Sequence, residues 1–99
     1  MRAGDCGRFG PPGLVSQLAR ACNSVHANIA EAAGQSTPRQ AARHLDVSIG
    51  SLNEAESHLS EASAVAFIAK EKADAFIGEV CALRRMTLSY KRWVLRNNE

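Results

Sequence analysis

A long amphipathic helix is predicted by residues 37–65, TPRQAARHLDVSIGSLNEAESHLSEASAV. Its start is well marked, because Thr37 can cap the first turn, Pro38 suits the first helical position and Gln40 completes a capping box. Mostly apolar side chains then recur at alternating steps of four and three, which keeps them on one helix face. They are Leu45, Ile49, Leu52, Glu56, Leu59 and Ser63.

Two further helices are predicted, one on each side of this stretch. Residues 14–33 place apolar side chains at steps of three and four, and Gly34 follows as a candidate C-cap. Residues 70–96 repeat the pattern after a short turn, and one stripe of this helix is expected to face a bundle core. That stripe consists of Phe76, Val80, Leu83, Thr87, Tyr90 and Val94. No alternating strand pattern competes, so the predicted fold class is all-α.

The composition indicates one small soluble domain. The chain has 99 residues, with 12 Lys and Arg against 10 Asp and Glu, and 45% of its residues are hydrophobic. Residues 1–13 hold four glycines together with Pro11 and Pro12, so we expect a flexible leader ahead of a helical domain at 14–99. No apolar run approaches the ~20 residues of a membrane span, and the leader lacks the hydrophobic stretch of a secretory signal. We therefore expect a cytoplasmic protein with no membrane partner.

A second apolar strip on helix 70–96 bears on self-association. It lies about 100° from the first stripe and consists of Ile77, Cys81, Leu88 and Leu95. Either this helix is buried on two sides by its own subunit, or the second strip contacts another subunit. We favour the second alternative, because a core this small is marginally stable without staples or partner subunits. We therefore expect a homo-oligomer with this strip in its interface.

The charges are unevenly distributed. Residues 1–43 carry five basic and two acidic side chains, residues 44–79 two and seven, and residues 80–99 five and one. The basic end also contains two aromatic rings, and its candidate nucleic-acid contacts are Arg84, Arg85, Tyr90, Lys91, Arg92, Trp93 and Arg96. Three of these arginines, at 85, 92 and 96, share one stripe and can neutralise phosphates without reading sequence. The alternative is a solvated helix end, where basic side chains suit the helix dipole.

Other polar residues are assigned structural roles. Glu56 lies within the apolar stripe of helix 38–65, where an unpaired carboxylate would be costly. Arg20 is a candidate partner for it, within the subunit or across an interface. Ser24 and Asn28 lie one helical turn apart and are expected to hydrogen-bond to a neighbouring helix.

No motif in the sequence indicates catalysis, a cofactor or a metal ion. The histidines have no Cys or Ser partner in a recognisable motif, and no Gly-rich loop opens a phosphate-binding helix. Glu54, His58 and Glu61 share a helix face, but bundle metal sites take ligands from several facing helices. The three cysteines, at 6, 22 and 81, are scattered without CxxC spacing, which favours reduced thiols. We therefore expect no enzyme.

The segment from Gly13 to Leu59 resembles, without gaps, a family of four-helix-bundle proteins encoded in intervening sequences of bacterial 23S ribosomal RNA. The resemblance rests on Gly-Leu-x-Ser-Gln-Leu at 13–18, Ser-x-x-x-Asn-Ile-Ala-Glu at 24–31, Gly34, and Gly-Ser-Leu-x-Glu-x-Glu at 50–56. It implies an antiparallel up-down bundle, relatives that form rings, often pentamers, and a structural role for Glu31. It also implies kinship with the accessory variability determinant of diversity-generating retroelements, a basic ring that binds nucleic acid and a reverse transcriptase.

The sequence departs from this family in several places. His26 stands where Pro is usual, Ala32 where Gly is usual, Gln35 where Arg is common, and Ala41 and His44 replace aromatic residues. The family's first long helix, normally ahead of Gly13, has no counterpart in residues 1–13. Either the chain is a three-helix remnant, or its start is set too late or its reading frame is truncated. In each case the apolar groove that this helix would fill needs another cover.

These observations lead to two functional hypotheses. The preferred one is a non-catalytic bundle with helices at 14–33, 38–65 and 70–96 that self-associates and binds RNA or another nucleic acid through its basic C-terminal helix. The alternative is a protein-interaction module without nucleic-acid function, whose exposed groove receives an amphipathic helix of a partner.

Overall fold

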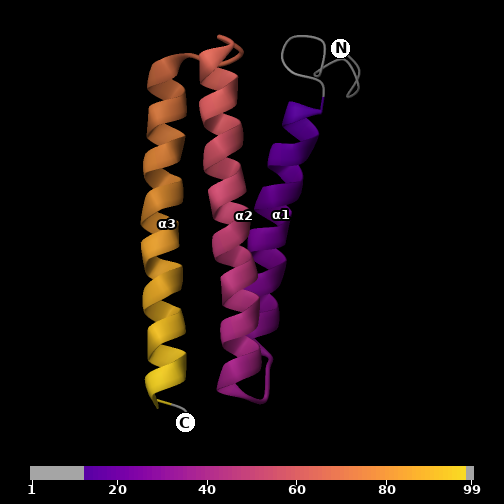
Figure 1. The fold of residues 1–99 in the computed structure, drawn as a ribbon, viewed down its shortest axis with the longest axis vertical. Helices are drawn as coiled ribbons and strands as arrows, with labels where there is room; N and C mark the ends of the chain where they lie inside the picture. The colour runs from indigo at the N-terminus through magenta and orange to yellow at the C-terminus, as the bar shows by residue number, and fades with distance from the viewer. Residues whose placement is uncertain (1–12, 98–99) are drawn as a thin grey trace.

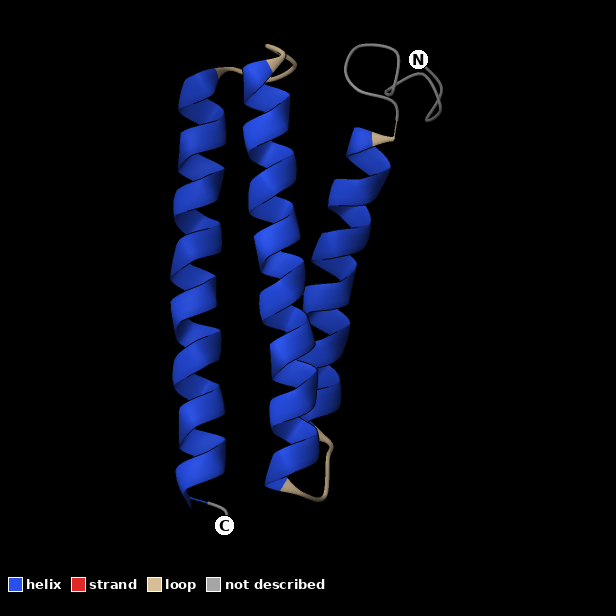
Figure 2. Ribbon diagram, viewed as in Figure 1, coloured by secondary structure: helices blue, strands red, loops and turns tan. Residues whose placement is uncertain are grey.

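The computed structural model describes residues 13–97, which form three α-helices and, within this range, no strand. The helices are α1 (Leu14–Ala33), α2 (Pro38–Ala64) and α3 (Lys70–Asn97). They run up and down in succession, joined by short loops (Figures 1 and 2). The all-α prediction is thus confirmed, and the helix bounds differ from the expected ones by at most one residue. The predicted leader lies outside the described residues, except for Gly13.

Local side-chain and backbone chemistry explains where the helices begin and end. Thr37 caps α2, since its Oγ1 accepts a hydrogen bond from the backbone N–H of Gln40 at 3.2 Å, with Pro38 in the first turn. α2 ends in a Schellman motif, in which the N–H of Phe67 donates to the carbonyl of Ala62 at 2.8 Å. Ala66 takes the left-handed position of that motif, with φ of 58°. The cap and the Schellman motif therefore fix where α2 begins and ends, and the chain turns at these two points.

The helices form an open layer with α2 in the middle. α1 and α3 both pack against α2, and within the described residues they make no close backbone contact with one another. The N-terminal half of α1 leans away from the other two helices (Figure 1). The Cα atoms span 49 × 25 × 14 Å, and a width of 25 Å suits three helices side by side with axes about 8–10 Å apart. One side of the layer therefore stays open.

The core is concentrated at one end of the layer. There the C-terminal ends of α1 and α3 lie beside the N-terminal part of α2. Leu45 is fully buried there and packs with Ala32, Ala41 and Val94, with Ile29 beside them. This cluster combines side chains of all three helices, so it holds the layer together at one end. Elsewhere α2 contacts α1 and α3 separately.

The expected core stripe of α3 is only partly correct. Thr87 and Val94 are buried, but Phe76 is 49% exposed and Leu83 and Tyr90 are each 37% exposed. The reason is that α3 contacts α2 through small side chains such as the fully buried Ala73, which rotates the larger ones toward the open side. The second strip lies on the other side of that contact and is half-buried throughout: Ile77, Cys81, Leu88 and Leu95.

Candidate interaction groove and basic face

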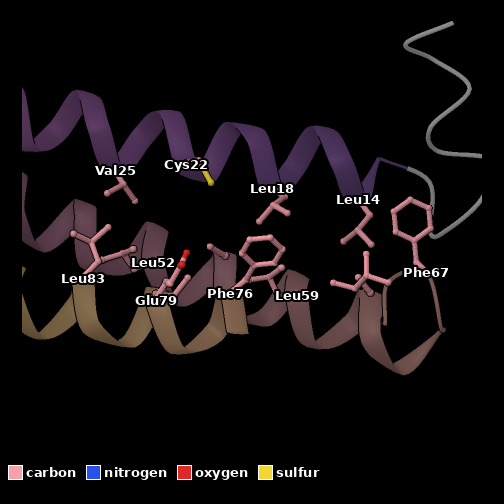
Figure 3. Close-up of a pocket in the computed structure, with 14 residues that line it drawn as sticks. Leu14, Leu18, Cys22, Val25, Leu52, Leu59, Phe67, Phe76, Glu79 and Leu83 are labelled. Atoms are coloured by element: carbon pink, nitrogen blue, oxygen red, sulfur yellow. The ribbon is translucent and has the colours of Figure 1, made fainter. Parts of the chain in front are cut away.

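An apolar groove of about 450 Å³ opens between α1 and α3, with α2 as its floor. Leu18 of α1 points toward Phe76 of α3 across it, Leu14 and Phe67 lie at one end, and Val25 and Leu83 lie at the other (Figure 3). We call this the open groove. Among the described residues that line it, Glu79 alone carries a charge. The expected apolar groove is thus present.

The surface beside the open groove is unusually apolar for an exposed helix face. Five large apolar side chains of α3 are at least 37% exposed: Phe76, Leu83, Met86, Tyr90 and Trp93. Large side chains have surfaces of about 150–250 Å² each. The exposed fractions of these five therefore add up to an area on the order of 500 Å². Contiguous exposed apolar surfaces of this size often mark interaction sites.

A series of hydrogen bonds joins α1 to α2. The hydroxyl of Ser51 donates to that of Ser24 at 2.8 Å, and Ser48 donates to the Val25 carbonyl at 3.2 Å. The side-chain amide of Asn28 donates to the Ser24 carbonyl at 2.9 Å. Its Oδ1 lies 3.1 Å from His44 Nδ1, and because an amide oxygen only accepts, His44 is the donor.

Ser24, Asn28, His44, Ser48 and Ser51 are called the polar ladder below. Ser24 and Asn28 thus make the inter-helix contacts expected of them. Glu31 differs, because its side chain is exposed and its backbone carbonyl accepts hydrogen bonds from Gly34 and Gln35. Within residues 13–97, no buried side-chain nitrogen or oxygen lacks a hydrogen-bond partner.

Glu56 pairs with Arg84 of α3, so the expected pairing with Arg20 within the subunit is wrong. The guanidinium Nη1 of Arg84 lies 2.8 Å from Glu56 Oε1 and also 2.8 Å from Asn53 Oδ1. The hydrogen bond to Glu56 raises the pKa of Arg84 above its ordinary value. Arg20 is exposed on α1, whereas Glu56 lies on the side of α2 that meets α3. This ion pair fastens α3 to α2.

The basic cluster of α3 divides into two sets. The first set, Arg84 and Lys91, faces α2. Lys91 Nζ lies 2.7 Å from Asp46 Oδ1. Arg85, Arg92 and Arg96 are exposed, and no described carboxylate pairs with them. We call these three the arginine line. The rings of Tyr90 and Trp93 stack with centroids 6.3 Å apart, closer to the open groove than the arginine line is.

Three other features bear on function. Within residues 13–97, no group of three or more His, Cys, Asp or Glu side chains is placed to hold a metal ion. None of the three described helices combines the length and the apolar character that crossing a membrane requires. Cys22 is exposed at the open groove and Cys81 is half-buried, both as free thiols.

Comparison with known proteins adds a family assignment. Residues 8–89 match the family model described as 23S rRNA-intervening sequence protein. No curated protein and no solved structure gives a significant match. The match covers well over half of the chain and agrees with its helical architecture. This protein therefore belongs to the family of 23S rRNA-intervening sequence proteins.

Proposed function

We propose that this protein is a non-catalytic helical module that self-associates by covering its open groove with a second copy. The observation that carries the proposal is the apolar lining of the groove, with a single charged residue among those described, beside a helix that exposes five large apolar side chains. Leaving such a surface in water is unfavourable by roughly 25 cal/mol per Å².

The exposed apolar area of α3 and of the groove walls favours a second copy as the molecule that covers the open groove. A stable dimer buries roughly 800 Å² per partner. The ~500 Å² exposed on α3 provides more than half of this, and the groove walls on α1 and α2 supply further apolar area.

Light scattering of the purified full chain across a dilution series tests this proposal. We expect the mass of a dimer or larger assembly at micromolar concentration, falling toward that of one chain on dilution. A mass of one 10.6 kDa chain at every concentration would contradict the proposal. Such a result would leave the groove to a helix of another protein, the alternative hypothesis above.

A second candidate function is contact with RNA or another nucleic acid. Its support is the arginine line, because three exposed guanidinium groups spaced along about 16 Å of helix can each neutralise a phosphate. Association of copies would strengthen this contact, since several weak patches then act at a high effective concentration. Binding of this kind depends on salt and discriminates little among sequences.

Charge reversal of the arginine line tests this second function. The double variant Arg85→Glu and Arg92→Glu is expected to abolish the gel retardation of a generic RNA at low salt, because two attractive phosphate contacts become repulsive. The control is Arg20→Glu with Arg39→Glu, which changes the net charge equally at exposed positions of α1 and α2. Retardation that persists in the arginine-line variant would remove the nucleic-acid hypothesis.

A further inference from the structure

A second hollow lies between α2 and α3, at the end of the layer where α2 begins and α3 ends (Figure 1). Its volume is about 550 Å³, which falls within the roughly 300–1,000 Å³ of small-molecule sites. Its lining residues on α2 lie on the opposite side of that helix from those of the open groove, so the two features open on opposite sides of the layer. We call it the basic hollow, after its charged residues Arg39, Arg43, Asp46 and Lys91.

The charges in the basic hollow are unbalanced. Arg39 and Arg43 come from successive turns of α2, and Lys91 comes from α3. Lys91 Nζ lies 2.7 Å from Asp46 Oδ1, so the carboxylate in the hollow is already paired. No carboxylate within residues 13–97 forms an ion pair with Arg39 or Arg43. Two guanidinium groups from one helix face therefore remain available to an anion.

The start of α2 reinforces this positive potential. α2 has 27 residues and no acidic residue in its first turn, where Arg39 stands instead. Because the positive end of a helix dipole favours negative groups, an arginine in that turn does not help the helix by itself. An anion in the basic hollow would be attracted both by the guanidinium groups and by the helix end. The charge pattern thus suits an anionic ligand better than it suits the isolated fold.

The other walls of the basic hollow indicate the chemical class of this anion. Pro38, Ala42 and Leu95 give it an apolar side next to the arginines. A phosphate monoester carries close to two negative charges and three terminal oxygens, which match two forked guanidinium groups. An internal phosphate of RNA carries one charge and is already served by the arginine line. The combination of two arginines and an apolar wall fits a phosphate monoester on a flat, largely apolar body.

We propose that the basic hollow binds the phosphate monoester of a nucleotide. Arg39 and Arg43 hold the phosphate, the base lies against Pro38 and Leu95, and Lys91 stays with Asp46 as part of the wall. The site is separate from the arginine line, none of whose residues lines the hollow. It also does not depend on the proposed self-association. A free nucleotide and the 5′ end of a nucleic-acid strand offer the same phosphate group.

Isothermal titration calorimetry of the full chain with adenosine monophosphate at low salt tests the site. Arg43→Gln removes one guanidinium at an exposed position and is expected to weaken binding by at least about 10-fold, through loss of charge-assisted hydrogen bonds. Arg85→Gln is the matched control, because it removes the same charge from the exposed arginine line and should leave the affinity unchanged. Adenosine, which lacks the phosphate, should not bind measurably.

Equal affinity of the native chain and the Arg43→Gln variant would overturn the proposal, as would equal weakening by Arg85→Gln or equal binding of adenosine. Circular dichroism checks that the helices persist in each variant. The variant Arg20→Glu with Arg39→Glu should lose nucleotide binding while it keeps the retardation of RNA. The two functions can therefore fail separately.

A short RNA with either a 5′-phosphate or a 5′-hydroxyl distinguishes the two sources of the phosphate. A preference for the phosphorylated strand that Arg43→Gln abolishes would support the site with a strand end as its ligand. Equal binding of both strands, together with binding of adenosine monophosphate, would support a free nucleotide. Absence of nucleotide binding and of any preference for the 5′-phosphate would overturn the proposal.

Discussion

Replacement of Leu45 by Ala is expected to lower the free energy of unfolding by about 2–5 kcal/mol. Leu45 is fully buried where α1, α2 and α3 meet, packed with Ala32, Ala41 and Val94. Truncation removes apolar contacts with all three helices and leaves a cavity that their backbones cannot close. Since small domains are stable by only about 5–15 kcal/mol, this would be among the most damaging single substitutions in the chain.

Urea unfolding followed by helical circular dichroism measures this effect, at one protein concentration because association also stabilises the fold. Val47→Ala is the matched control, since Val47 lies on the same helix and is 47% exposed. We expect it to change stability by less than about 0.5 kcal/mol. Leu45→Met keeps the volume and should cost less than about 1.5 kcal/mol. Equal stability of the Leu45→Ala and Val47→Ala variants would contradict the position of the core.

Met86→Lys is expected to weaken self-association by at least about 100-fold, which corresponds to roughly 3 kcal/mol of buried, unpaired charge. Met86 is 67% exposed in the single chain, so a lysine there should leave the fold intact. In the proposed self-association this exposed apolar face of α3 is covered by a second copy. An ammonium group introduced there would lose its hydration without gaining a partner.

Sedimentation velocity across a dilution series measures the change in dissociation constant, and circular dichroism checks that the helices persist. Ser57→Lys is the control, because Ser57 is exposed on the outer side of α2, away from the open groove. It adds the same charge and should leave association unchanged. If both variants associate as the native chain does, the exposed apolar face of α3 is not the interface.

The helices themselves were predictable because their signals are local. The Thr37 cap, Pro38 and the apolar spacing of α2 depend only on residues a few positions apart, so they can be recognised in a short stretch of sequence. The class of fold and the family could be identified for the same reason. The hydrogen bonds of Ser24 and Asn28 were expected because polar groups on an apolar helix face need partners.

The orientation of α3 was not predictable in the same way. Its apolar residues occupy three overlapping stripes, and helical spacing alone does not say which of them meets α2. The choice depends on long-range contacts, among them the buried Ala73 and the ion pairs of Arg84 and Lys91. For this reason two expected phosphate contacts face α2, and the partner of Glu56 comes from α3. The steps of three and four from Phe76 to Trp93 were the available signal for the exposed apolar face of α3.

The polar ladder has a consequence for how the molecule accommodates an occupant. If α1 slid by one turn along α2, the hydroxyls of Ser48 and Ser51 would lose their acceptors and the amide of Asn28 would lose His44. Each unsatisfied buried group costs about 1–3 kcal/mol, so axial slippage is strongly opposed. Tilting of α1 about the ladder would disturb these bonds less than sliding would. The open groove between α1 and α3 could therefore change in width while α1 keeps its axial register on α2.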